Sequence, residues 1–146
     1  GEGVSGTPLY FAAKKDNDEM SELLIKNGAD VNIASAENGQ TPLHIACSDG
    51  SSKVAKILIV CGSDMERKTL NDETALHLAT AYNHPDIATM LYEAKADLTA
   101  TNQIGNPLHY AISEKHEDLT RMMIKWKVDI EAKDRDGDAP LALAAM

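Results

Sequence analysis

Several residue types that mark special protein classes are scarce in this sequence. It has two cysteines, one phenylalanine and one tryptophan among 146 residues, and aromatic residues make up 4%. Two cysteines are too few for a disulfide scaffold or a four-ligand zinc site, so we expect Cys47 and Cys61 to be reduced and structural. We expect the single tryptophan, Trp126, to serve packing rather than recognition. No apolar run approaches the roughly 20 residues of a membrane-spanning helix, so we expect no membrane insertion.

Positive charge is also in short supply. Fourteen Lys and Arg stand against 23 Asp and Glu, which gives a net charge of -9. Nucleic-acid affinity rests largely on cationic contacts with phosphates, so we expect no nucleic-acid partner. A negative surface speeds the encounter with a basic protein, and a protein partner of that kind is our expectation. The 43% hydrophobic and 25% charged content fits a folded domain rather than a disordered chain.

A period of about 33 residues organises the chain. The segment TPLHIA at 41–46 recurs as TALHLA at 74–79 and as NPLHYA at 106–111. Weaker copies stand at 7–12 (TPLYFA) and 139–144 (APLALA), and the steps between first residues are 34, 33, 32 and 33. This regularity predicts a repeat protein with one structural unit in each period.

A second apolar pattern follows each segment at a constant offset. It consists of two residues four apart, which lie on one face of a helix. The pairs are Met20 and Leu24, Val54 and Leu58, Ile87 and Leu91, and Leu119 and Met123. Turn pairs such as Asn38-Gly39 and Asp136-Gly137 precede the next copy, and these residue types tolerate positive φ. Each repeat is therefore predicted to hold two short helices and a projecting hairpin-like finger.

The helix ends carry their own signals. Thr41 precedes a proline and is predicted to cap the first helix of its repeat. The last copy begins with alanine, so we expect Asp138 to cap there instead. Second helices end at glycine in the early repeats, where a positive φ is expected, and Lys95 and Lys127 stand at the equivalent places. We therefore expect both lysines to adopt a positive φ.

These features resemble the ankyrin repeat family, which has a 33-residue period and a Thr-Pro-Leu-His segment. The resemblance covers five copies, at about 3–36, 37–69, 70–102, 103–134 and 135–146, the last one incomplete. It implies an all-α repeat solenoid of stacked helix-turn-helix units with projecting fingers. Repeats bury their apolar faces against neighbours, so we expect Leu141 and Leu143 to be partly uncovered and further repeats or domains to follow Met146; the alternative is a short native tail.

The five histidines invite a metal or catalytic interpretation, which the period disfavours. His44, His77 and His109 hold equivalent places in successive repeats, and packed helices lie roughly 10 Å apart, so the three rings cannot share one zinc ion. The resemblance implies that each ring bonds to the backbone of the neighbouring finger. We assign His84 and His116 a structural role as well.

Other signatures of catalysis are missing. The sequence contains no GxSxG, HExxH, phosphate loop or dinucleotide fingerprint. The DRDGD segment at 134–138 lacks the glutamate that completes a calcium loop, and it coincides with a predicted turn. We therefore predict a noncatalytic protein without catalytic, cofactor-binding or metal-binding residues. Without an N-glycosylation sequon, a cytoplasmic or nuclear location is expected.

The resemblance implies partner binding through the finger tips and the inner face of the first helices. The free positions there form one strip, which we call the partner strip: Gln40, Ser48, Asp49, Leu70, Asn71, Glu73, Ala81, Tyr82, Gln103, Ile104, Asn106, Ser113, Glu114, Arg135, Asp136 and Asp138. Within it Leu70, Tyr82 and Ile104 are large apolar residues at places that should face water, as binding hot spots do. The alternative is that Leu70 and Ile104 pack finger against finger.

The sequence thus predicts a noncatalytic protein–protein interaction module. The alternative is a regulatory or targeting ankyrin segment of a larger enzyme or channel, whose chemistry lies outside this sequence. One modification site is also suggested, because Leu24 and the segment 30–32 resemble the pattern accepted by an oxygenase that hydroxylates asparagines in ankyrin fingers. The candidate is Asn32, and the competing interpretation is that its side chain bonds within the turn.

Overall fold

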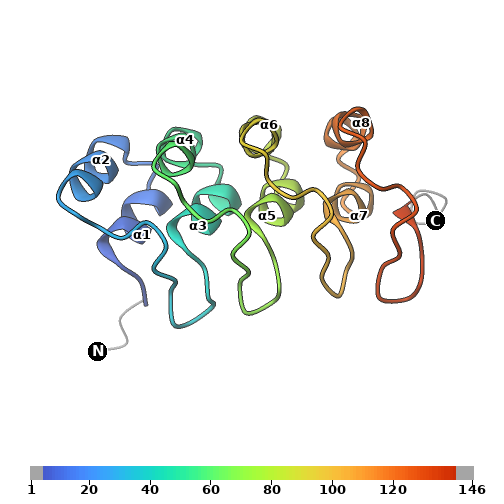
Figure 1. Cartoon of the computed structure of the whole chain (residues 1–146), viewed down its shortest axis with the longest axis horizontal. Coiled ribbons are helices and arrows are strands. Elements are labelled where there is room, and N and C mark those ends of the chain that lie inside the picture. The colour runs from blue at the N-terminus through green and yellow to red at the C-terminus, as the bar shows by residue number, and fades with distance from the viewer. Residues whose placement is uncertain (1–4, 141–146) are drawn as a thin grey trace.

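In the computed structural model, residues 5–140 are described, and they form helices and loops without a strand. The helices alternate between two rows along the long axis of the molecule (Figure 1). One row, the inner helices, holds α1 (Pro8–Lys14), α3 (Pro42–Asp49), α5 (Ala75–Ala81) and α7 (Pro107–Ser113). The other row, the outer helices, holds α2 (Asp18–Lys26), α4 (Ser52–Val60), α6 (Pro85–Glu93) and α8 (Glu117–Lys125). The predicted all-α repeat solenoid is confirmed.

The core is one continuous column shared by neighbouring repeats. Each helix of the α1 row contacts the next helix of that row, and α2, α4 and α6 do the same on the other side. Within residues 5–140, the first four repeats each contribute the leucine of their TPLH-like segment, and Leu43 and Leu76 are each 1% exposed. The predicted apolar pair Val54 and Leu58 is fully buried. Leu24 is only half-buried, whereas the equivalent Leu58, Leu91 and Met123 are fully buried.

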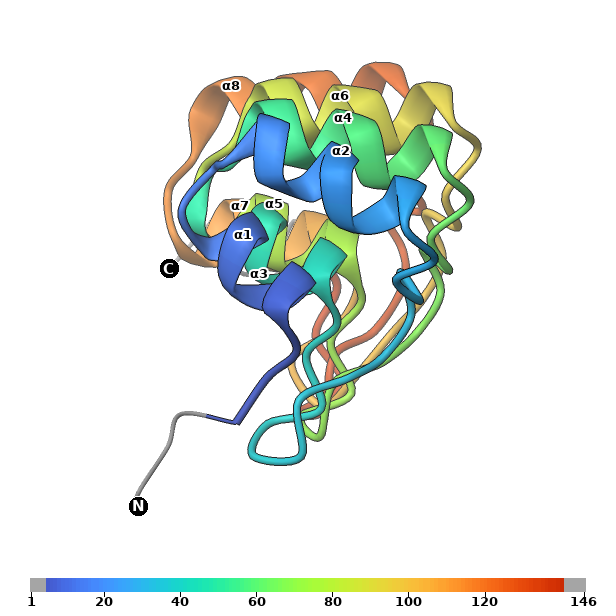
Figure 2. The same cartoon turned by 90° about the vertical axis from the view of Figure 1, so that its left-hand side faces the viewer.

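Fingers project from the two helix rows to one side (Figure 2). We number them in chain order: finger 1 (27–41), finger 2 (61–74), finger 3 (94–106) and finger 4 (126–139). Each is closed near its tip by a backbone hydrogen bond. The bond joins residues 35 and 40 in finger 1, 69 and 73 in finger 2, 102 and 105 in finger 3, and 134 and 138 in finger 4. Finger 1 is therefore one residue longer, and finger 3 one residue shorter, than the other two.

Three of the four inner helices, α3, α5 and α7, start with a cap in which a histidine takes part, whereas the Thr7 cap of α1 has Tyr10 at that place. The Thr41 hydroxyl accepts from the His44 amide at 3.4 Å, and the Thr41 amide donates to His44 Nδ1 at 3.0 Å. The same reciprocal pair joins Thr74 to His77 and Asn106 to His109. The imidazole thus performs the part that Glu or Gln plays in a capping box. The cap predicted at Asp138 would accept from the amides of residues 141 and 142, which lie outside the described residues. The predicted exposure of Leu141 and Leu143 concerns residues that also lie outside this range.

The other nitrogen of each ring reaches the next finger. His44 Nε2 lies 2.8 Å from the carbonyl oxygen of Arg67, and His77 Nε2 lies 3.1 Å from that of Gly105. His109 makes the same bond to Asp138 at 3.1 Å. With Nδ1 accepting from the cap amide, Nε2 carries the proton, and each ring is neutral. The predicted backbone ties are confirmed.

His84 and His116 make ties in the opposite direction. His84 Nε2 lies 3.1 Å from the carbonyl oxygen of Ser48, and His116 Nε2 lies 3.1 Å from that of Ala81. Both carbonyls belong to inner helices of the preceding repeat. The structural role assigned to these two residues is therefore confirmed, and adjacent repeats are joined from both sides.

Both lysines adopt the predicted conformation at the ends of α6 and α8. Their φ values are 69° at Lys95 and 62° at Lys127, and the equivalent Gly28 and Gly62 have φ values of 93° and 85°. A side chain in this region costs roughly 1 kcal/mol because Cβ crowds the following carbonyl oxygen. The fold thus holds a small strain at each of these two helix ends.

Replacing these lysines with glycine should stabilise the protein. We expect Lys95→Gly and Lys127→Gly each to raise the free energy of unfolding by about 1 kcal/mol. The control is Lys56→Gly within α4, where glycine should lower it by about 1 kcal/mol. Urea unfolding followed by Trp126 fluorescence measures all three variants. Lower midpoints in both lysine variants would show that the strain argument is wrong.

The buried histidines make folding stability dependent on pH. Burial lowers the pKa of His77 to about 4 and also lowers the pKa of His44. The unfolded chain therefore takes up a proton on His77 near pH 6.5, whereas the folded chain takes it up only near pH 4. The stabilisation that comes from burying the neutral His77 ring is fully present above pH 6.5, and it is lost as the pH falls from 6.5 to about 4.

The His77→Gln variant isolates this effect, because Gln can still serve in the cap. The difference in unfolding free energy between the wild type and His77→Gln should shrink by on the order of 3 kcal/mol between neutral pH and about pH 4. Denaturant unfolding at a series of pH values measures it, and contributions from other titrating groups cancel in the difference. A difference that does not vary with pH would contradict the assignment.

Candidate functional site

The partner strip lies on the inner helices and the fingers, and most of its residues are accessible. Those exposed are Asp49, Leu70, Asn71, Tyr82, Gln103, Ile104, Ser113, Glu114, Arg135 and Asp136. Those half-buried are Gln40, Ser48, Glu73, Ala81 and Asp138. These fifteen positions therefore provide surface that a partner can reach.

One strip position was predicted wrongly. Asn106 is 1% exposed, and its side chain accepts from the His109 amide at 3.1 Å and donates to the carbonyl of Asp129 at 3.1 Å. Because finger 3 is one residue shorter, Gly105 takes the place that Glu73 holds in finger 2, and Asn106 is the helix cap. A side chain at Gly105 would overlap the His109 ring, so no partner-facing group exists there.

The three large apolar strip residues are strongly exposed. The exposed fraction is 71% for Leu70, 58% for Tyr82 and 49% for Ile104. Leu70 also touches the preceding finger, because its amide donates to the carbonyl of Asn38 at 3.0 Å and its Cγ lies close to Gly39. The finger-to-finger contact considered for Leu70 is thus present, although it leaves most of the side chain uncovered.

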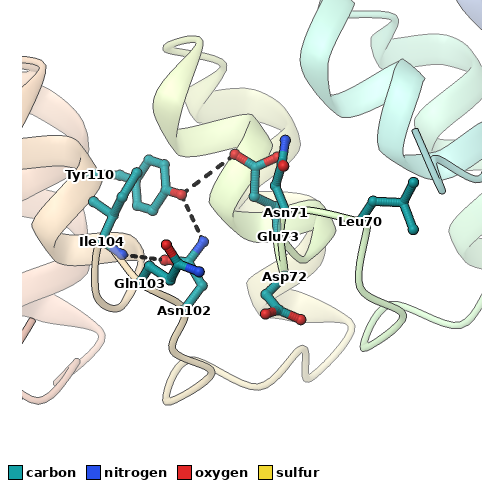
Figure 3. A pocket seen from close by; sticks show the side chains of 8 residues that line it. All are labelled: Leu70, Asn71, Asp72, Glu73, Asn102, Gln103, Ile104 and Tyr110. Carbon is teal, nitrogen blue, oxygen red and sulfur yellow. Dashed lines mark hydrogen bonds between the residues drawn. The ribbon is translucent and has the colours of Figure 1, made fainter. Parts of the chain in front are cut away.

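A cavity of about 300 Å³ separates finger 2 from finger 3. We call it the interfinger pocket; it is lined by Leu70, Asn71, Asp72, Glu73, Asn102, Gln103, Ile104 and Tyr110. Figure 3 shows the Tyr110 hydroxyl, from α7, directed toward Glu73 and Asn102, while the Leu70 side chain points the other way. A second cavity of about 270 Å³, between fingers 3 and 4, shares Gln103 and Ile104.

Glu73 is the central acidic group of the interfinger pocket. Its carboxylate accepts from the Tyr110 hydroxyl and from the Thr69 hydroxyl, each at 3.5 Å. The side-chain Nδ2 of Asn102 donates to the Tyr110 hydroxyl oxygen at 2.8 Å (Figure 3). Partial burial raises the pKa of Glu73 and that of Tyr110. Among residues 5–140, no ion pair involves Glu73.

Three lining residues were not recognised from the sequence. Tyr110 occupies the place where Ile45 and Leu78 stand in earlier repeats, so a hydroxyl at an aliphatic position was the available signal. Asn102 and Asp72 belong to turns, and polar residues in turns carry little information about function. The pocket forms only where two repeats meet, and for this reason the pattern within one repeat does not reveal it.

Asn32 lies in a turn and links two fingers. Its amide donates to Asp30 Oδ1 at 2.8 Å, and its side-chain oxygen accepts from the Asp64 amide at 2.8 Å. The turn predicted around Asn32 is therefore present. The second bond reaches the following repeat and was not expected from the sequence.

The cysteines and the tryptophan have the environments expected of them. Cys47 is free and fully buried, and burial raises the pKa of its thiol, whereas Cys61 is free and exposed. Trp126 stacks on Tyr92 with ring centroids 4.4 Å apart, which confirms its packing role.

On the outer helices, Val60 is 78% exposed and lines cavities of about 400 and 500 Å³ that the sequence did not predict.

The described residues hold neither a metal-binding cluster nor a membrane-spanning helix. Within 5–140, no group of three or more His, Cys, Asp and Glu side chains is arranged to hold a metal ion. None of the helices in that range combines the length and the apolar character needed to cross a bilayer.

Comparison with known proteins finds the same repeat over most of the chain. Residues 9–102 match the family model described as ankyrin repeats in three copies, and residues 106–135 match the model of a single ankyrin repeat. Such repeats are generally protein–protein interaction modules. The resemblance identified from the sequence is confirmed.

Individual relatives are diverse. Human Rabankyrin-5 is 33% identical over 116 residues, covering 66% of this chain and 10% of that protein. The E3 ubiquitin-protein ligase XBAT32 of Arabidopsis thaliana is 40% identical over 84 residues, covering 57% and 16%. The ARF GTPase-activating protein Git of Drosophila melanogaster is 34% identical over 91 residues, covering 62% and 12%. The chain thus spans between 10% and 16% of the length of these three relatives.

Proposed function

Because this chain belongs to the ankyrin repeat family, we propose that it is a noncatalytic module that binds another protein through its finger tips and the inner face of its first helices. The observation that carries the proposal is the exposure of Tyr82 and Ile104, at 58% and 49%, among polar residues of the partner strip. Large apolar side chains within a polar surround are typical anchors of protein interfaces. The interfinger pocket beside Ile104 adds a concave feature to this surface.

The charge of the partner strip favours a basic protein over nucleic acid. The strip has a single basic residue, Arg135, and its acidic members are Asp49, Glu73, Glu114, Asp136 and Asp138. Complementary charge steers a basic partner toward this face and fixes its register. The free thiols of Cys47 and Cys61 fit a reducing compartment, which supports our proposal of a cytoplasmic or nuclear location.

A second candidate function is a regulatory or targeting segment of a larger enzyme or channel. It is supported by the names of two relatives, an E3 ubiquitin-protein ligase and an ARF GTPase-activating protein, in which the matched region is 16% and 12% of the whole. In that case the partner strip would bind a target or a regulator, and other parts of the protein would perform the reaction. The length of the full transcript distinguishes the two functions.

Loss of the two apolar anchors should weaken binding without unfolding the protein. We expect Tyr82→Ala combined with Ile104→Ala to reduce the affinity for a partner captured by the wild-type protein by at least about 2 kcal/mol, or about thirtyfold. The matched control is Val60→Ala, which removes an exposed apolar side chain from the outer helices. Affinity is measured by calorimetry, and folding by Trp126 fluorescence. Equal affinities for the double variant and the wild type would refute the proposal.

Asn32 remains the candidate for hydroxylation. Its side-chain oxygen is held by the Asp64 amide, so finger 1 must open locally before an oxygenase reaches it. Treatment with an oxygenase that hydroxylates ankyrin asparagines should add one oxygen atom to the peptide containing Asn32, as read by mass spectrometry. The Asn32→Ala variant should gain none. An unchanged mass of the wild-type peptide would leave Asn32 with its structural role alone.

A further inference from the structure

The interfinger pocket contains a carboxylate that has no counter-ion among the described residues. Glu73 is half-buried, and its hydrogen bonds from Tyr110 and Thr69 are both 3.5 Å long. Partial burial of a carboxylate is unfavourable unless a cation or strong donors compensate for the lost water. The raised pKa of Glu73 agrees with incomplete compensation. The pocket therefore presents an acceptor that is only weakly satisfied within the chain.

Glu73 and Asp72 are the two carboxylates that line the pocket, and the polar atoms of Asn102 are already hydrogen-bonded within the chain. Asn102 Oδ1 already accepts from the amides of Ile104 and Gly105, at 2.9 and 3.2 Å. Its Nδ2 donates to Tyr110, which in turn donates to Glu73. Asp72 has a φ of 60° at the tip of finger 2, and it lines the same cavity. Two carboxylates thus border one cavity from adjacent positions of finger 2.

Finger 3 provides the apolar border of this cavity. Ile104 is 49% exposed and lies beside Tyr110, opposite Glu73 (Figure 3). A ligand group that suits both borders needs an apolar stem to cover Ile104 and a cationic head to reach the carboxylates. Lysine and arginine have this form. The planar guanidinium carries five donors, pairs well with carboxylates and is less strongly hydrated than an ammonium group, which favours arginine at a half-buried site.

We propose that the interfinger pocket binds an arginine side chain of the partner protein, with the aliphatic stem against Ile104 and the guanidinium donating to Glu73, while Asp72 adds negative charge at the edge of the cavity. This inference rests on the proposed function, because it assigns one residue of the partner to one cavity of the partner strip. Tyr110 and Asn102 act as positioning residues that hold Glu73 toward the cavity. A volume of about 300 Å³ accommodates one side chain of this size together with water.

The test uses single-residue probes, so it does not depend on knowing the partner. N-acetyl-arginine methylamide is titrated into the isotope-labelled protein to tens of millimolar, and backbone amide shifts are followed by NMR. The matched probe is N-acetyl-citrulline methylamide, which has nearly the same shape without the charge, and the lysine derivative is a third probe. We expect saturable shifts at residues 70–73 and 102–104 with arginine, smaller ones with lysine and none with citrulline.

Variants assign the binding to the pocket. Glu73→Gln should weaken the arginine probe by about tenfold, in keeping with the loss of a charged hydrogen-bonding partner. Asp72→Asn should weaken it by a smaller factor, since Asp72 is exposed at the finger tip. The control is Glu93→Gln, which removes an exposed acidic group of α6 outside the partner strip and should leave the affinity unchanged. Melting curves establish that each variant is folded.

Each result supports or overturns the inference. Absence of shifts with arginine, equal shifts with citrulline, or shifts that Glu73→Gln does not reduce would each overturn it. Lysine binding as tightly as arginine would overturn the choice of arginine. None of these results bears on whether Tyr82 and Ile104 anchor a partner protein, so the pocket assignment can fail while the proposed function stands.

Discussion

The hydrogen bonds of the buried histidines hold this structure together. In three successive repeats a neutral imidazole accepts from the cap of its own helix and donates to a carbonyl of the next finger, so one side chain fixes both a helix start and the spacing between repeats. The interfinger pocket depends on this tie directly. His77 holds Gly105 at the base of finger 3, and its ring packs edge-on against Tyr110 with centroids 5.2 Å apart. The position of the pocket wall is therefore set by a residue that does not line the pocket.

Most of the fold could be predicted from the sequence because the information is repeated. Each helix face, cap and turn occurs several times at one period, and a signal that is weak in a single copy, such as the alanine in place of proline at 75, is supported by its equivalents. Ties that run between repeats were harder to predict in detail. The backward bonds of His84 and His116 join atoms more than thirty residues apart, and only three-dimensional stacking brings these together. Leu24 fits the apolar pattern and is nevertheless half-buried, whereas Met123 at the equivalent place of α8 is fully buried, so the pattern alone does not predict the degree of burial.

The candidate site was predicted less completely than the fold. Family resemblance identified accessible positions correctly apart from Asn106, where a one-residue difference in finger length shifted the correspondence between repeats. It did not identify Asp72, Asn102 and Tyr110 as lining one cavity with Glu73. Those residues depart from what equivalent repeats carry, and recognition requires such departures since the common framework is already used for packing and capping. Residues that recur in every repeat therefore predict the fold, whereas the pocket is lined partly by residues that do not recur and so carry no repeated signal.

Ile104 belongs to two cavities at once, one on each side of finger 3. A partner segment that crosses the fingers would place consecutive anchors on opposite sides of this single side chain. A larger or smaller side chain at position 104 changes the shape of both cavities, so the two partner residues that fill them cannot vary independently. Changes of specificity at this surface should accordingly arise as paired substitutions in the partner, matched to one substitution in the solenoid.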